Sequence, residues 1–267
     1  MMQMGVYTGV SLMRISELIA SQGCSQAIAE LRLKLERNPG DLTAVEGMAK
    51  ALRASGAYRQ SLSYFQRLQN GEMQNAVANA LAPGRIIWNI DIACLHWLMD
   101  EHPTAIALMY DLAAGTLNGS VRYGDAAGGI SQGLLLYYMA LTDHASSEAS
   151  FALEYLRDRV SRIKPRRVWP CPVAEYLLAE TKIEAVMEAV HDQSKVVRLD
   201  IAKSELATRR RLCVAIFYAG VIARAAGNEP QCIARMHECN ELDDPLLEQE
   251  WYLARYEIQK TQRGGTH

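Results

Sequence analysis

The sequence predicts an all-α protein in which antiparallel helical hairpins pack side by side. Three observations favour this fold class. Apolar residues recur at three- and four-residue steps along almost the whole chain, and no segment alternates strictly between apolar and polar residues. Valine and isoleucine do not gather into short runs bounded by turns, so the sequence does not favour a sheet. Prolines and glycines stand between the periodic segments, where helices are expected to begin and end.

The periodic segments predict about thirteen helices joined by short connections. Asp41 follows Asn38-Pro39-Gly40 and is expected to cap the next helix, because its carboxylate can accept from a backbone N–H of the first turn. Pro103 and Pro245 stand at helix boundaries, because proline lacks the donor that a helix interior needs. The longest predicted connection is KPRRVWPCP at 164–172. The predicted helices are 10–22, 25–37, 42–55, 58–69, 72–81, 85–101, 104–115, 126–142, 147–164, 172–191, 194–226 with a break, 229–241 and 245–260.

Composition and charge exclude several classes of protein. The 267 residues are 49% hydrophobic and 22% charged, which excludes wholesale disorder. A net charge of −2 argues against a nucleic-acid or membrane-surface protein, since these need a large cationic face. The chain has no long apolar run, no secretory signal at its start and no framework spacing among its six cysteines. These features predict a cytoplasmic protein with reduced thiols.

Residues 42–75 carry small, glycine and aromatic residues at fixed places. Ala49 takes the eighth place, Gly56 the fifteenth, Ser61 the twentieth and Phe65 the twenty-fourth. Small residues at the eighth and twentieth places let two antiparallel helices approach closely, and the glycine turns the chain between them. This segment resembles one tetratricopeptide repeat (TPR), a helical hairpin of about 34 residues.

The resemblance extends to residues 213–246, where Gly220 and Cys232 take the eighth and twentieth places and Gly227 the fifteenth. It implies stacked hairpins that form a right-handed solenoid with one continuous core. The implied organisation is a single domain over residues 1–267, with its clearest repeats at 8–41, 42–75 and 213–246, a capping helix at 246–260 and an irregular helical middle at 76–212.

The resemblance implies a protein-binding function without catalysis and without a cofactor, because stacked hairpins leave an extended concave surface. We expect the partner to be another protein or peptide, and neither a nucleic acid nor a membrane. The residues at the family's groove-facing places are the first binding candidates. They are Glu46, Lys50, Arg53, Phe217, Tyr218 and Arg224.

A second candidate surface is a basic patch around the connection at 164–172. Residues 151–211 carry 13 basic and 9 acidic groups, a net +4, so this patch suits an acidic partner. Its members are Arg162, Lys164, Arg166 and Arg167. By analogy with small stand-alone helical-repeat proteins, the chain is expected to be a bacterial immunity or chaperone-like protein that binds and blocks a toxin or effector.

Two alternatives stay open. The first is an enzyme with its active site on the glycine-rich segment 115–133, although glycines there also serve tight turns and close helix approach. Its first catalytic candidates are Arg122, Tyr123, Asp125 and Ser131. The second is a scaffold or regulator that forms a homodimer through its terminal helix, where Trp251, Leu253 and Tyr256 are expected to lie exposed.

Cys232, His237 and Cys239 are of the residue types that bind zinc, but their spacing matches no known finger and lacks a fourth ligand. Cys232 and Cys239 fall instead on packing places of the hairpin, and a buried free cysteine behaves as a small apolar side chain. We therefore expect core packing here and no metal.

Overall fold

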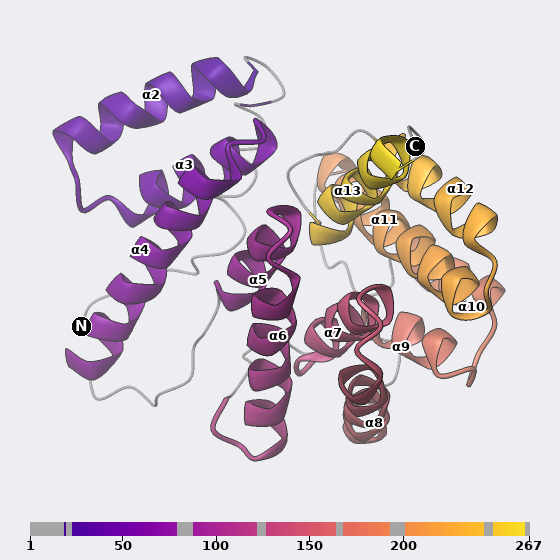
Figure 1. The fold of residues 1–267 in the computed structure, drawn as a ribbon. Coiled ribbons are helices and arrows are strands. Elements are labelled where there is room, and N and C mark those ends of the chain that lie inside the picture. The colour runs from indigo at the N-terminus through magenta and orange to yellow at the C-terminus, as the bar shows by residue number, and fades with distance from the viewer. Residues whose placement is uncertain are drawn as a thin grey trace. The chain divides into compact units, whose positions relative to one another are not determined.

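The computed structural model describes Ile19 and residues 23–78, 88–121, 127–163, 168–192, 201–242 and 248–264. This part of the chain forms twelve helices, α2 to α13, joined by turns and loops (Figure 1). Helices that follow one another pack as antiparallel pairs, which confirms the all-α prediction and the hairpin pairing. The chain divides into two compact units, Met1–Leu95 and His96–His267. The right-handed solenoid and the single domain stay predictions.

The first unit contains α2 (Cys24–Arg37), α3 (Leu42–Ala54), α4 (Tyr58–Ala78) and the beginning of α5 (Asn89–Leu98). α3 packs against both α2 and α4. Asp41 caps α3 as predicted, because its side chain accepts from the backbone N–H of Ala44 at 3.1 Å. The cap satisfies a donor that the first helical turn leaves without an intrahelical partner.

The helices of the 42–75 hairpin approach closely at the predicted places. Ala49 is fully buried, and the hydroxyl of Ser61 donates to its carbonyl oxygen at 2.7 Å. A larger residue at either place would hold the two backbones apart. Gly56 turns the chain between α3 and α4 with a φ of 81°, a conformation that favours glycine.

The second unit begins within α5, and its other helices follow in sequence order. Neighbouring helices pack together at α6–α7, α7–α8, α11–α12 and α12–α13, and α11 also contacts α7, α9, α10 and α13. None of the described helices is both long and apolar enough to cross a bilayer. The bounds are α6 His102–Leu117, α7 Ile130–Thr142, α8 Ser146–Arg162, α9 Cys171–Leu177, α10 Ile183–His191, α11 Ile201–Ala225, α12 Glu229–Asn240 and α13 Gln249–Gly264.

The α11–α12 hairpin repeats the packing of α3 and α4. Gly220 lies so close to α12 that a Cβ atom there would be 2.9 Å from the Cε of Met236 and 3.3 Å from the carbonyl oxygen of Cys232. Gly227 turns the chain between the two helices with a φ of 76°. In both hairpins a glycine therefore turns the chain, and a small residue lies where the two helices approach each other.

Two predicted helix boundaries are wrong. The predicted helices 58–69 and 72–81 form one helix, α4, because a single interior glycine, Gly71, costs only about 1 kcal/mol. The predicted helix 172–191 is divided into α9 and α10. Ala179 adopts a φ of 59°, and the N–H of Glu180 donates to the carbonyl oxygen of Glu175, which closes the end of α9. The predicted helix 10–22 lies outside the described residues except for Ile19.

Gly133 lets α7 and α8 pack closely, and its replacement by alanine is expected to destabilise the protein. An added Cβ would lie 2.6 Å from Cδ1 of Tyr155 and 2.7 Å from Cδ2 of Leu156, and both side chains are fully buried. The hydroxyl of Tyr155 donates to the carbonyl oxygen of Gly129 at 2.8 Å, which restricts the ring. We expect a loss of about 1–3 kcal/mol from overpacking, which exceeds the gain of about 1 kcal/mol in helix propensity.

Urea unfolding measures this difference. The matched control is Glu154→Ala, at an exposed site of α8, which is expected to change stability by less than about 0.5 kcal/mol. A Gly133→Ala variant at least as stable as the native protein would contradict the packing argument.

Candidate functional site

The three groove candidates of the first unit lie buried on α3 and have partners in their own unit. Glu46 and Lys50 form an ion pair one helical turn apart. Arg53 is only 2% exposed and donates to the Asp91 carboxylate at 2.7 Å. Lys50 lies 5.8 Å from the centre of the Trp88 ring. These side chains therefore hold the start of α5 against α3, and their contact with a partner protein stays a prediction.

Burial also changes the pKa of one member of this cluster, Lys50. Loss of solvent around the ammonium lowers the pKa of Lys50, and the charge of Glu46 opposes this effect. The sequence placed the two charges on one helix face. It gave no sign that Trp88 would lie beside Lys50 or that Asp91 would pair with Arg53, because both partners come from a later segment of the chain.

The groove candidates of the second unit also contribute to helix packing. Phe217 and Tyr218 are fully buried in α11, and the Phe217 ring meets the ring of Tyr138 edge-on, with centroids 4.9 Å apart. Arg224 donates to Thr142 of α7 at 2.9 Å and to Glu229 at 2.7 Å. As in the first unit, their contact with a partner protein stays a prediction.

Arg224 also ends a buried polar chain that the sequence did not reveal. The indole N–H of Trp97 donates to the hydroxyl of Tyr138 at 3.1 Å, and that hydroxyl donates to Glu257 at 2.6 Å. Arg224 completes the chain by donating to the other Glu257 oxygen at 2.9 Å. Burial disfavours the charged form of Arg224, but its hydrogen bonds to Glu229 and Glu257 outweigh burial and raise its pKa. Burial, followed by the charge of Glu257, raises the pKa of Tyr138.

A second polar cluster surrounds His102 at the start of α6. The hydroxyl of Tyr256 donates to Asp100 at 2.6 Å and lies 2.8 Å from Nε2 of His102. Nδ1 of His102 lies 3.0 Å from the Asp143 carboxylate, and the ring stacks on Trp97 with centroids 4.0 Å apart. Since Tyr256 gives its proton to Asp100, its oxygen is free to accept in the contact with Nε2 of His102.

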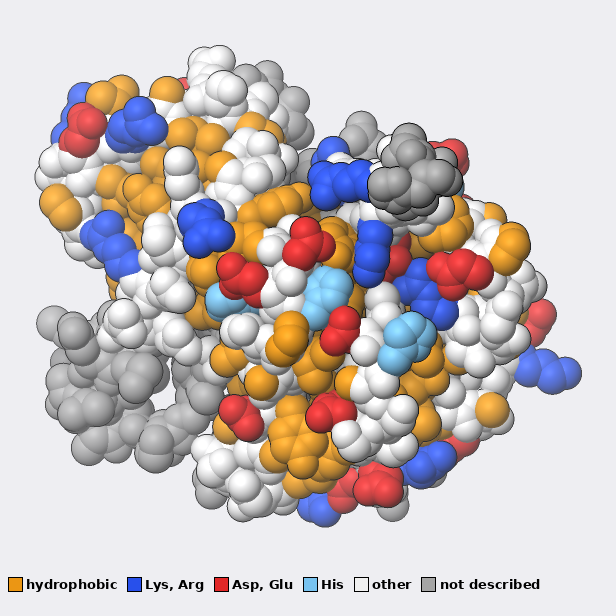
Figure 2. All heavy atoms as spheres, viewed as in Figure 1, with side chains coloured by type: hydrophobic (Ala, Val, Ile, Leu, Met, Phe, Trp, Pro, Cys, Tyr) orange, Lys and Arg blue, Asp and Glu red, His pale blue; other side chains and the backbone are white. Residues whose placement is uncertain are grey.

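The His102 cluster joins the α5–α6 turn to the end of α7 and to α13. On the face drawn in Figure 2, histidine and carboxylate side chains gather over these helices of the second unit. Burial, followed by the hydrogen bond to Asp100, raises the pKa of Tyr256. The sequence does not set His102 apart, because Asp143 and Tyr256 lie 41 and 154 residues away in the chain.

The basic patch is only partly described. Arg162 is exposed and forms an ion pair with Asp158 of the same helix at 2.6 Å. The other three candidates lie outside the described residues, and they are Lys164, Arg166 and Arg167. The interaction of this patch with an acidic partner therefore stays a prediction.

The glycine-rich segment 115–133 is described at its two ends. Arg122, Tyr123 and Asp125 lie outside the described residues, and Ser131 lies in the first turn of α7. At the first end, a Cβ atom on Gly115 would be 2.6 Å from the side chain of Val121. Gly115, like Gly133 in α7, therefore stands where packing demands a small residue. The enzyme alternative for this segment stays untested.

The expectation that the terminal helix exposes apolar residues is wrong. Trp251 is 4% exposed, Leu253 is fully buried and Tyr256 is 8% exposed. The indole N–H of Trp251 donates to the carbonyl oxygen of Asn240 at the end of α12, and Tyr256 contacts His102. α13 uses its apolar side chains to cover α11 and α12.

Cys232 and Cys239 are fully buried in the α11–α12 hairpin, where the sequence placed them as packing residues. In the described part of the chain, no three His, Cys, Asp or Glu side chains are arranged to hold a metal ion.

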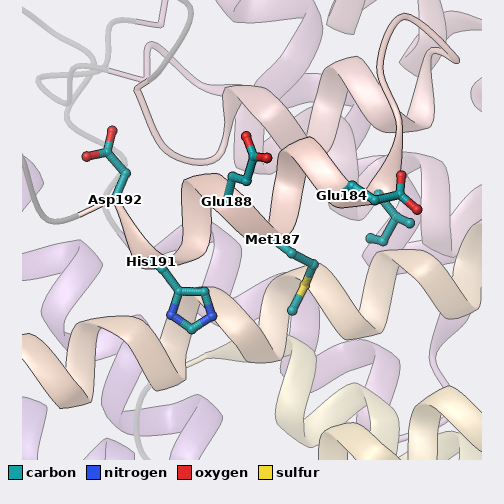
Figure 3. A pocket seen from close by; sticks show the side chains of 6 residues that line it. Glu184, Met187, Glu188, His191 and Asp192 are labelled. Atoms are coloured by element: carbon teal, nitrogen blue, oxygen red, sulfur yellow. The ribbon is translucent and has the colours of Figure 1, made fainter.

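The outer face of α10 forms an open hollow of about 760 Å³. Ile183, Met187 and His191 make one row at four-residue spacing, and Glu184, Glu188 and Asp192 make the neighbouring row. Figure 3 shows Glu188 and Asp192 pointing to one side of the helix, and Met187 and His191 to the other. The hollow therefore has an acidic edge and a mainly apolar edge, both formed by α10.

No family model matches the sequence, and no curated protein is significantly similar to it. The resemblance to tetratricopeptide repeats therefore depends on the residues of the two hairpins, and the findings identify no family.

Proposed function

We propose that this chain is a non-catalytic protein–protein interaction module built from TPR-like repeats. The glycine turn and the small residue at the helix contact, which two separate hairpins share, support the repeat assignment. By analogy, the narrower proposal is a cytoplasmic immunity or chaperone-like protein that blocks a toxin or effector.

The open hollow on α10 is the observation that carries this proposal. Ligands of enzymes usually bind in enclosed pockets with converging polar groups, whereas protein partners bind to shallow surfaces with a polar rim. Glu184 and Glu188 are exposed, while Ile183 and Met187 are half-buried beside them. The fitting partner is therefore a protein segment with basic side chains along one edge and apolar side chains along the other.

Charge reversal on α10 is expected to weaken partner binding. The Glu184→Lys/Glu188→Lys variant replaces two exposed carboxylates with ammonium groups, so a basic segment meets repulsion instead of attraction. We expect at least a tenfold loss of affinity, which corresponds to about 1.4 kcal/mol. The measurement is affinity purification from the native cell with the native chain and the variant as bait, followed by titration of the recovered protein.

The matched control is Asp111→Lys/Glu154→Lys, which makes the same change of charge at exposed sites of α6 and α8. A stoichiometric partner that binds the native chain and the control, but not the α10 variant, supports the proposal. Equal binding to all three chains removes α10 as the surface. Turnover of a small molecule by the purified chain, with no protein partner, would overturn the binding function.

A further inference from the structure

Two cysteine side chains meet inside the α11–α12 hairpin. The Sγ atoms of Cys213 and Cys239 lie 3.2 Å apart, and the thiol of Cys239 also lies 3.7 Å from the carbonyl oxygen of Cys213. Both residues are buried, at 4% and 0% exposed. A disulfide needs its sulfur atoms about 2.0 Å apart, so the two atoms have to move closer by only about 1 Å.

The hairpin geometry explains why these two thiols face each other. Cys213 precedes Gly220 by seven residues, and Cys239 follows Cys232 by seven residues. Seven residues are about two helical turns, so Cys213 lies on the same face of α11 as Gly220. For the same reason Cys239 lies on the same face of α12 as Cys232, and these two faces meet in the antiparallel hairpin. In the 42–75 hairpin, leucines occupy the places that correspond to Cys213 and Cys239. Packing at this level therefore does not require sulfur.

We propose that Cys213 and Cys239 are an oxidation site that forms an intrachain disulfide with a peroxide. The thiolate of one cysteine attacks a peroxide oxygen, the O–O bond breaks, and a sulfenic acid forms. The second thiolate attacks the sulfenic sulfur, so the S–S bond forms as the S–O bond breaks. Two electrons pass from the sulfur atoms to the peroxide. The two thiol protons leave with the two oxygen atoms as two water molecules.

The surroundings of the two thiols determine how fast they are oxidised. The hydrogen bond to Cys239, burial and the charge of Glu250 each raise the pKa of Cys213, so little thiolate is present at neutral pH. Oxidation is therefore slow, and it accelerates as pH rises. The product ties α11 to α12 and constrains the unfolded chain, so the oxidised protein resists unfolding better than the reduced protein.

Peptide mapping tests the proposal on the folded, full-length protein. Hydrogen peroxide is added at pH 8, the remaining thiols are alkylated, and the protein is digested with trypsin without reduction. Cys213, Cys232 and Cys239 fall on separate tryptic peptides, at 212–224, 225–235 and 236–255. We expect the first and third peptides to be joined, with a mass lower than their sum by two hydrogen atoms. We also expect the midpoint of urea unfolding to rise.

Single alanine variants provide the controls. Cys213→Ala and Cys239→Ala are expected to remove the cross-link and the rise in midpoint, and Cys232→Ala is expected to retain both. The proposal is overturned if the half-buried Cys24 is oxidised while peptides 212–224 and 236–255 are recovered separately with alkylated thiols. The peptide map of the native protein decides the question by itself, so the test remains valid even if a variant folds poorly. The test is also independent of the α10 hollow.

Discussion

Replacement of Arg224 by methionine is expected to lower the free energy of unfolding by about 3–5 kcal/mol. Methionine keeps much of the side-chain volume but removes the charge that pairs with Glu257. The Glu257 side chain is 4% exposed, so its carboxylate would stay buried with Tyr138 as its remaining hydrogen-bond donor among the contacts described above. A buried charge without its counter-ion has lost the hydration that stabilises it in the unfolded chain.

A double-mutant cycle separates this effect from lost packing. The Arg224→Met/Glu257→Met variant removes both charges, so its stability loss is expected to be smaller than the sum of the two single losses by at least about 2 kcal/mol. Urea unfolding of the four proteins gives the interaction energy. Arg235→Met is the matched control, because Arg235 forms an exposed pair with Glu238, and its loss is expected to be below about 1 kcal/mol. Additive single effects would show that the charges at Arg224 and Glu257 are not coupled.

The sequence predicted the interior of the hairpins because the relevant spacings are local. Ala49 and Ser61 are twelve residues apart, as are Gly220 and Cys232, and one turn fixes each pair opposite the other. Asp41 was predictable as a cap for the same reason, since its acceptor function requires only the next helical turn.

The predicted helix boundary was wrong where a residue adopts a backbone conformation that its type does not favour. Ala179 ends α9 in a left-handed conformation that glycine usually supplies, so the sequence predicted an unbroken helix. Glu184 and Glu188 share a face in either case, because they are four residues apart. What the sequence lacked was the end of α9, which makes α10 a separate helix with its own packing.

The polar clusters were unpredictable for a different reason. Tyr138 and Glu257 are 119 residues apart, and His102 and Tyr256 are 154 apart, so no spacing within one helix brings either pair together. The exposure predicted for Trp251 failed in the same way. An apolar stripe on a terminal helix shows that something covers it, but only the fold shows that α11 and α12 do so.

The stability of the protein is expected to fall as pH rises from about 5 to 9, and Glu250 is expected to cause much of this fall. Glu250 lies in the first turn of α13 and is 5% exposed. Burial, followed by the charge of Glu248, raises its pKa to about 8, while hydrogen bonds from the backbone and Tyr218 and the charge of Arg210 oppose the increase. The side chains of Cys213 and Cys239 also lie near Glu250.

The sign of the effect follows from proton counting. Between pH 4.5 and about 8, the folded protein keeps a proton on Glu250 that the unfolded chain has lost. Stability therefore decreases as pH rises through this window, and the loss stays complete above the folded-state pKa. Since one pKa unit corresponds to about 1.4 kcal/mol, the expected loss is about 3–5 kcal/mol.

The Glu250→Gln variant isolates this contribution. Glutamine has nearly the same shape, can still accept from Tyr218 and carries no charge at any pH, so the variant lacks the titration but keeps the packing. At pH 5 the two proteins are expected to differ by less than about 1 kcal/mol, and at pH 9 the variant is expected to be more stable by about 3–5 kcal/mol. Urea unfolding from pH 5 to 9 measures the difference, with Glu154→Gln on the exposed face of α8 as the control. Parallel stability curves for the native protein and Glu250→Gln would mean that Glu250 ionises in the folded state as readily as it does in the unfolded chain.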